Sequence, residues 1–158
     1  MSSLVYLLRA DGCPYYPHQV YFVGVHETRF EGPRLEEVVA RHNAGLGSTW
    51  TRRFSGWELR DVFRREDQSD ANDRATRLMY RHGLCRARGG QWAEDALSPE
   101  DVCEIVRRVA ATYRHLCPRC GFALANHPRP DVCTAVQYAA WVRQSWGGSA
   151  FVAGDVPC

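Results

Sequence analysis

The chain contains Leu4-Val5-Tyr6-Leu7-Leu8 and, further along, Val20-Tyr21-Phe22-Val23-Gly24-Val25. Both runs are short and combine β-branched with aromatic side chains, which is typical of strands that pack in a core. Residues 11–18 between them are rich in proline, glycine and other turn-forming types, and they are long for a hairpin loop. The sequence therefore predicts two paired antiparallel strands at the start of the chain.

Helices and one further strand are predicted after this pair. Pro33 opens a helix because proline is tolerated in the first helical turn, and Ser98-Pro99-Glu100-Asp101 combines a capping serine with acids in the first turn. The predicted elements are a helix over 33–44, a strand over 57–63, a helix from 69 or 70 to 82, a helix over 98–116 and a helix over 135–146. This order predicts an α+β fold with a small three-stranded antiparallel sheet flanked by helices.

Composition limits the class of protein. The 158 residues, of which 45% are hydrophobic, suffice for one core of ordinary size plus a small appendage. There is no run of about 18 apolar residues that would indicate a membrane span, and no basic segment precedes the first strand as it would in a signal peptide. We therefore expect an intracellular protein that is not secreted, in which the 7 cysteines serve as thiols and metal ligands.

All 20 basic residues are arginine, and the formal net charge is +2. The positive excess lies in residues 1–92, which carry 14 arginines and 11 acidic residues. The guanidinium group of arginine can donate two parallel hydrogen bonds to phosphate oxygens, which lysine cannot do. A GC-rich genome would also favour arginine codons. Charge alone therefore favours nucleic-acid binding only slightly.

A cluster of cysteines and one histidine near the C-terminus has the spacing of a metal site. Cys117 and Cys120 are followed by His127 and Cys133. Three thiolates and one imidazole form a tetrahedral set that suits a structural zinc ion. The alternative is four side chains that lie close by chance, but a segment with few apolar residues needs something to hold it folded.

Several motifs, taken in order, resemble the GIY-YIG nuclease superfamily over roughly residues 3–133. The motifs are Leu4-Val5-Tyr6, Tyr21-Phe22-Val23-Gly24, Arg34-Leu35-Glu36-Glu37, Arg41-His42-Asn43-Ala44-Gly45, Gly47 to Phe54, Met79 to Gly83 and Arg88-Gly89-Gly90-Gln91-Trp92. The last motifs and the C-terminal cluster resemble a branch with a CCHC-type zinc knuckle seen in large DNA viruses. A viral origin, with the host cytoplasm or nucleus as the location, is implied by this resemblance only.

The resemblance also implies an organisation and a function. The expected segments are a GIY-YIG-like nuclease domain over 1–95, a connecting helix over 96–116, a zinc knuckle over 117–133, and a C-terminal helix and tail over 134–158. Members of the superfamily hydrolyse a DNA phosphodiester with a divalent ion held by a glutamate. The expected cofactors are therefore structural Zn²⁺ and catalytic Mg²⁺ or Mn²⁺, and the expected partner is DNA, including branched or single-stranded forms.

The implied catalytic residues are Tyr6 or His42 as the group that activates water, Arg34 as the phosphate contact, and Asp73 or Asp70 as the metal ligand. The superfamily's second tyrosine matches Phe22, and its glutamate aligns with Ala75 or Thr76, neither of which binds a metal ion. Ordinary explanations stand beside these roles. Tyr6 and Phe22 would also fit a sheet core, His42 a core edge, and the two aspartates surface pairs with Arg74 and Arg77.

Aromatic and arginine side chains in a glycine-rich loop indicate a nucleic-acid contact. The expected contacts are Trp50, Arg52 and Arg53, together with Arg119 in the knuckle.

These observations leave three candidate functions. The first is a DNA endonuclease of GIY-YIG type, the second is a nucleic-acid-binding module that has lost catalysis, and the third is a structural or interaction protein of a viral particle.

Overall fold

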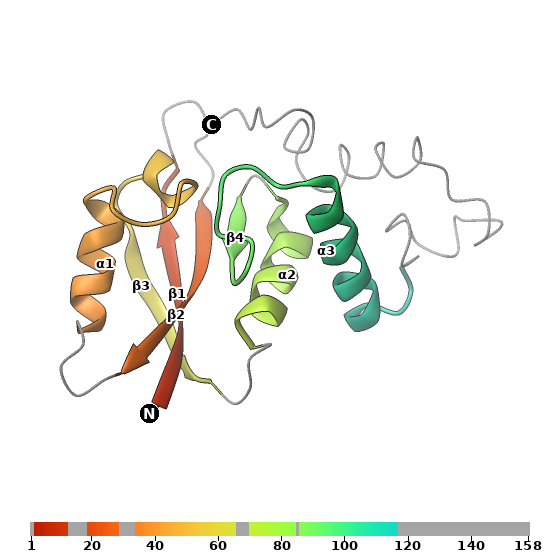
Figure 1. Cartoon of the computed structure of the whole chain (residues 1–158), viewed down its shortest axis with the longest axis horizontal. Helices are drawn as coiled ribbons and strands as arrows, with labels where there is room; N and C mark the ends of the chain where they lie inside the picture. Colours follow the sequence, from red (N-terminus) through yellow and green to blue (C-terminus); the bar gives the residue numbers. More distant parts are fainter. Residues whose placement is uncertain (1, 13–18, 29–33, 66–69, 85, 117–158) are drawn as a thin grey trace.

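The structure is a computed structural model of the chain, and it describes residues 2–12, 19–28, 34–65, 70–84 and 86–116 (Figure 1). The four predicted zinc ligands, Arg119 and the helix predicted over 135–146 lie outside these residues. Within them, no helix combines the length and the apolar character that crossing a membrane requires.

The described part of the chain forms a four-stranded sheet in the order β3-β1-β2-β4. β1 (Ser2–Ala10) pairs antiparallel with both β2 (Val20–Thr28) and β3 (Glu58–Arg64). β4 (Ala87–Gly89) adds to β2 in the parallel direction. The expectation of a three-stranded antiparallel sheet is therefore wrong, because the short segment after the second long helix returns to the sheet as a fourth, parallel strand.

The helices begin and end close to where their sequence signals predict. α1 spans Leu35–Asn43, α2 spans Asp70–His82 and α3 spans Pro99–Thr112. The Ser98 hydroxyl accepts from the Asp101 N–H while the Asp101 carboxylate accepts from the Ser98 N–H, a capping box that satisfies two otherwise unpaired donors. α3 ends before the predicted limit at residue 116.

The sheet separates two cores (Figure 1). On one face, α1 and the short 3₁₀ helix η1 (Thr51–Arg53) cover an aromatic-rich core. Its buried members are Tyr6, Leu8, Ala10, Val20, Phe22, Trp50, Phe54 and Trp57. On the other face, α2 lies against the sheet and α3 packs on α2, so that α3 shares the core of the preceding elements. The side chains on these two faces alternate along β1 and β2, as the pleat requires.

Candidate active site

Tyr6 and His42 meet on the α1 face of the sheet. Tyr6 projects from β1, and His42 projects from the last turn of α1, so that the Tyr6 hydroxyl lies 3.1 Å from His42 Nε2. Both side chains are buried, with 4% and 6% of their surface exposed. The structure therefore joins two of the four predicted catalytic residues in one hydrogen bond.

Thr51 on η1 fixes the orientation and the tautomer of this histidine. His42 Nδ1 lies 3.1 Å from Thr51 Oγ1, and that hydroxyl donates its own proton to the Ser48 carbonyl oxygen at 3.2 Å. Because the threonine hydroxyl has one proton, Oγ1 can only accept from Nδ1–H. Nε2 is then left as the acceptor for the Tyr6 O–H, and the three side chains form one ordered chain of donors and acceptors.

Two glycines make room for the hydrogen-bonded side chains of Tyr6, His42 and Thr51. A Cβ at Gly24 would overlap the phenol of Tyr6, and a Cβ at Gly47 would overlap both the imidazole of His42 and the hydroxyl of Thr51. Gly24 belongs to the strand motif and Gly47 to the loop motif that resemble the GIY-YIG superfamily. Both glycines are therefore explained by close packing against the tyrosine–histidine–threonine chain.

Hydrogen bonds and one ion pair restrain the segment between α1 and β3, which contains η1. The Asn43 amide donates to the Trp57 carbonyl oxygen at 3.0 Å and accepts from the Trp57 N–H at 2.6 Å, which ties the end of α1 to the start of β3. Beyond β4, Glu94 accepts hydrogen bonds from Thr49, and Asp95 pairs with Arg53 at 2.6 Å. These contacts restrain the loop that carries Thr51 from both ends.

The protonation states of the pair follow from burial. Burial raises the pKa of Tyr6 to about 12. Burial, and after it the positive charge of Arg41, lowers the pKa of His42 below its ordinary value of 6.5. At neutral pH the pair is therefore a neutral tyrosine that donates to a neutral imidazole, which is ready to accept a proton.

A polar hollow of about 430 Å³ lies at the end of α1, and its lining does not include Tyr6, His42 or Thr51. It is lined by the end of α1 and by η1, through residues that include Asn43, Arg52 and Arg53. The Arg52 side chain is exposed, whereas Arg53 pairs with Asp95. Two of the predicted nucleic-acid contacts thus line this hollow, and Arg52 is the more exposed of the two.

The structure does not bring Arg34 and Asp73 to this place. Arg34 caps the start of α1 and His42 lies near its end, so that at about 1.5 Å rise per residue they are about 12 Å apart along the axis. Asp73 lies on α2, across the sheet, where it pairs with Arg108 of α3 at 3.6 Å. The four predicted catalytic residues are therefore split between two sites.

The side chains that the structure describes near Tyr6 and His42 do not fit a Mg²⁺ or Mn²⁺ site. These ions require several oxygen ligands, of which carboxylates are the usual protein contribution. Among the residues the structure describes, no group of three or more histidine, cysteine or acidic side chains is placed to hold an ion. Asp73 faces α3, and the two positions predicted to align with the superfamily glutamate, Ala75 and Thr76, are both buried and carry no carboxylate.

Trp50 and Phe22 are both core residues. Trp50 is fully buried, with its ring 5.0 Å from that of Phe54 and 6.0 Å from that of Trp57, so its faces contact protein and not nucleic acid. Phe22 lies 5.0 Å from the ring of His42 and supplies packing but no proton. The hypothesis that Trp50 stacks on a base is therefore not compatible with its burial.

Sequence reasoning overlooked Thr51 and Ser48. Their spacing of three residues is a recognisable local motif, because a serine hydroxyl that accepts from the N–H three residues on is a common turn contact, as Thr51 N–H to Ser48 Oγ at 3.2 Å is here. That motif predicts a turn. It does not reveal that the same threonine reaches His42.

No protein-family model, curated protein or solved structure matches this chain.

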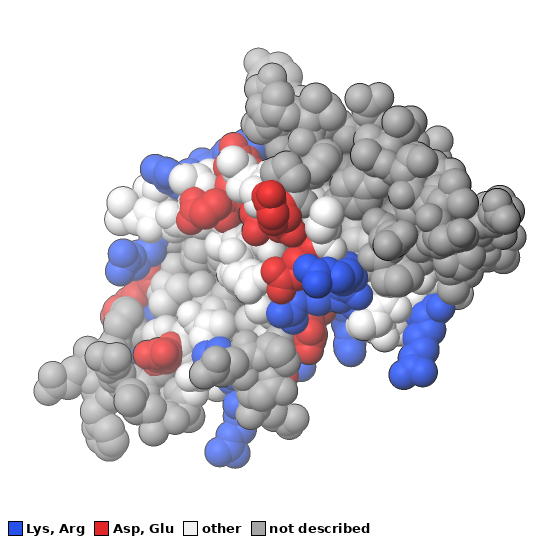
Figure 2. All heavy atoms as spheres, turned by 45° about the vertical axis from the view of Figure 1, so that its right-hand side comes forward, with Lys and Arg blue, Asp and Glu red and all other residues white. Residues whose placement is uncertain are grey.

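Surface charge alone does not identify a DNA-binding face. On the face shown in Figure 2, acidic side chains form a band across the described surface and arginines lie around them. Any contact with DNA on the described surface therefore has to be argued from particular arginines and their surroundings.

The lowered pKa of His42 predicts that acid destabilises the fold. Below the ordinary value of 6.5, the unfolded chain binds a proton that the folded chain does not, so the free energy of unfolding falls as pH falls. Urea unfolding of wild type at about pH 7.5 and about pH 5.5 should show a lower midpoint at the lower pH. His42→Gln should reduce the difference, whereas the exposed His115→Gln should retain it. An equal pH dependence in all three proteins would contradict the assignment.

Proposed function

We propose that this protein is a DNA endonuclease of GIY-YIG type that hydrolyses a phosphodiester bond beside Tyr6 and His42. The observation that supports it is the hydrogen-bonded chain from Tyr6 through His42 to Thr51, whose sequence neighbours Asn43 and Arg52 line a polar hollow at the end of α1. A neutral imidazole held in one tautomer is a proton acceptor suited to neutral pH. We propose Arg52 instead of Arg34 as the phosphate contact, because Arg52 of η1 lines the hollow at the end of α1 that carries His42, whereas Arg34 lies at the start of that helix.

The proton steps can be written from the side chains alone. A water molecule attacks phosphorus and gives its proton to the Tyr6 oxygen, while the Tyr6 hydroxyl passes its own proton to His42 Nε2. The imidazolium that forms donates from Nδ1 to Thr51 as before. The bond to the departing oxygen breaks, and that oxygen takes a proton from solvent. Arg52 stabilises the negative charge that accumulates on the phosphate oxygens.

Nicking of a supercoiled plasmid, with Mg²⁺ or Mn²⁺ in the buffer, tests the proposal. Wild type is compared with Arg52→Gln, Arg34→Gln and His42→Gln on duplex, branched and single-stranded DNA. We expect loss of nicking in His42→Gln, a reduced rate in Arg52→Gln and a nearly unchanged rate in Arg34→Gln. Nicking that survives His42→Gln would show that the reaction takes place elsewhere.

A catalytically lapsed DNA-binding module is the second candidate. Two observations favour it: Phe22 lacks the hydroxyl of the superfamily's second tyrosine, and Asp73 lies across the sheet from His42. This candidate predicts DNA binding that weakens steeply with salt, because each phosphate contact releases counterions, and no nicking by wild type on any of the substrates above. Nicking that depends on His42 would exclude it.

The zinc site remains a proposal from sequence. Cys117, Cys120, His127 and Cys133 are expected to bind one structural Zn²⁺ and to leave no open position for a catalytic water. Metal analysis of the purified protein should give about one zinc per chain. A Cys120→Ser, Cys133→Ser double variant should contain none, whereas a Cys103→Ser variant, altered at an exposed cysteine of α3, should keep its zinc. Wild-type zinc content in the double variant would contradict the assignment. The knuckle's Arg119 would then lose its proposed role in DNA contact.

A further inference from the structure

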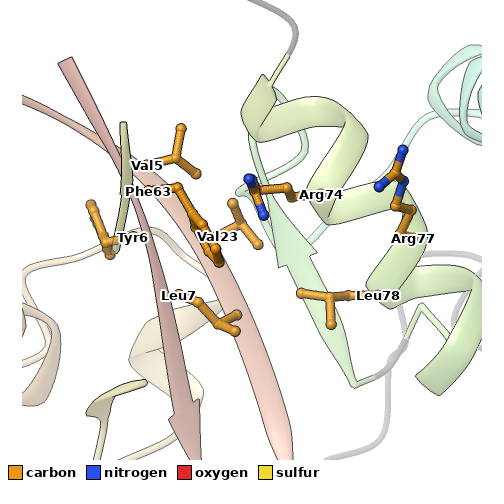
Figure 3. A pocket seen from close by; sticks show the side chains of 8 residues that line it. All are labelled: Val5, Tyr6, Leu7, Val23, Phe63, Arg74, Arg77 and Leu78. Carbon is orange, nitrogen blue, oxygen red and sulfur yellow. The ribbon is translucent and has the colours of Figure 1, made fainter. Parts of the chain in front are cut away.

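A groove of about 170 Å³ lies on the α2 face of the sheet, across from Tyr6 and His42 (Figure 3). Its floor is apolar, because the uncovered parts of β1, β2 and β3 present small and aromatic side chains there. One wall is α2, which contributes two arginines and a leucine. The residues that line it are Val5, Tyr6, Leu7, Val23, Phe63, Arg74, Arg77 and Leu78, of which Tyr6 turns its side chain away from α2 (Figure 3).

Arg74 lies over the groove and Arg77 lies at its edge, and neither forms an ion pair with an acidic side chain among the described residues. The Arg74 guanidinium carbon lies 3.4 Å from the centre of the Phe63 ring, and Arg77 follows one turn later on α2 (Figure 3). Two cations that border an apolar floor, and that are not neutralised there, fit a ligand that carries both negative charge and an apolar body.

We propose that this groove binds one nucleotide of a single-stranded nucleic acid. The Arg74 guanidinium is planar and lies on Phe63, and in the proposed complex a base stacks on its opposite face, which is how unpaired bases are often held. Arg77 then contacts the adjoining phosphate, a partner that suits the guanidinium fork. A duplex does not fit this description because its bases already stack on one another.

An acidic peptide is the alternative partner, and the geometry favours it less. Aspartate and glutamate have flexible aliphatic stems with no flat face to lie on the Arg74 guanidinium. A nucleotide supplies the flat ring and the charge at the same time. The proposal rests on nucleic acid as the partner of this protein but not on hydrolysis, because the groove and the tyrosine–histidine pair are on opposite faces of the sheet.

The test uses the full chain and a fluorescent oligothymidylate, with binding followed by anisotropy at several salt concentrations. The Arg74→Gln, Arg77→Gln double variant is compared with Arg107→Gln, Arg114→Gln, which removes two exposed arginines on or just after α3 and so changes net charge equally. We expect the dissociation constant of the groove variant to rise about tenfold or more. The slope of log affinity against log salt should fall by about 1.4 for two contacts to a single strand. The control should change little on both counts.

The methyl NMR signals of Leu7, Val23 and Leu78 provide a second readout in the wild-type protein, where no substitution can disturb folding. They should shift on addition of the oligothymidylate and shift far less with inorganic phosphate. Equal weakening in the two double variants, methyl signals that do not move, or tighter binding of a polyglutamate peptide at these methyls would each overturn the proposal. If the wild-type protein does not nick DNA, but the groove variant binds oligothymidylate more weakly and the methyl signals shift as expected, only the proposed endonuclease activity is refuted.

Discussion

Tyr6→Phe is expected to lower the rate of plasmid nicking by about 10²–10⁴-fold, the range over which a positioned proton-transfer group contributes to catalysis. The substitution removes one oxygen and keeps the ring, so the packing against Phe22 at 6.4 Å between ring centres should persist. What is lost is the hydroxyl that passes the water's proton to His42 at 3.1 Å. The measurement is the initial rate of conversion of supercoiled to nicked plasmid.

Tyr80→Phe is the matched control. It removes the same atom from a tyrosine on α2 whose ring stacks on Tyr113, on the other side of the sheet. Its nicking rate should equal that of wild type, and its urea midpoint shows whether loss of a tyrosine hydroxyl in itself affects the fold. Equal nicking rates for wild type and Tyr6→Phe would show that the Tyr6 hydroxyl takes no part in the reaction.

The pH dependence of nicking separates catalysis from simple structural support. His42 must be neutral to accept a proton, and its pKa is lowered by burial, so the rate should rise with pH around a midpoint below 6.5. Thr51→Val removes the acceptor that holds Nδ1–H, and it should lower the rate and shift this midpoint. Thr51→Ser keeps the hydroxyl and should preserve both. A purely structural threonine would change stability without moving the midpoint.

Local signals predicted most of the fold, and a long-range pairing was missed. The two strands at the start, the capping box at Ser98 and the extent of α2 all depend on neighbouring residues. β4 does not, because Ala87-Arg88-Gly89 has little strand propensity and its middle residue is charged. It forms because α2 returns the chain beside β2, and Arg88 is then fully buried. The order of residue types therefore does not predict the pairing of β4 with β2.

The same limit applies to the site. Tyr6 and His42 were predicted as candidates because their motifs resemble a known family, and the structure brings the two together. Asp73 fails as a partner because the buried stripe of α2, which includes Ala71 and Ala75, faces the sheet. At about 100° per residue, Asp73 lies about 160° away from Ala75 and therefore points toward α3. Which face of α2 meets the sheet decides the role of each acid on it, and the mixed polarity of this helix leaves that choice open in sequence.

Trp50→Ala is expected to destabilise the fold by about 3–5 kcal/mol, the usual cost of deleting a large buried aromatic side chain. Trp50 has no exposed surface and joins Phe54 and Trp57 in the aromatic core under α1. Its indole N–H has no hydrogen-bond partner among the described residues, so packing is the contribution that the substitution removes. Urea unfolding at neutral pH measures the loss.

Two further variants, Arg52→Ala and Trp50→Phe, serve as controls for Trp50→Ala. Arg52→Ala removes an exposed side chain two residues away, and its free energy of unfolding should stay within about 0.5 kcal/mol of wild type, as is usual for surface positions. Arg52→Ala should weaken DNA binding more than Trp50→Ala does, because Arg52 lines the hollow and Trp50 does not reach solvent. Trp50→Phe should retain much of the packing and bind DNA like wild type. A Trp50→Ala protein that keeps its stability but loses DNA binding would instead establish Trp50 as a stacking platform, and it would mean that the loop opens to expose it.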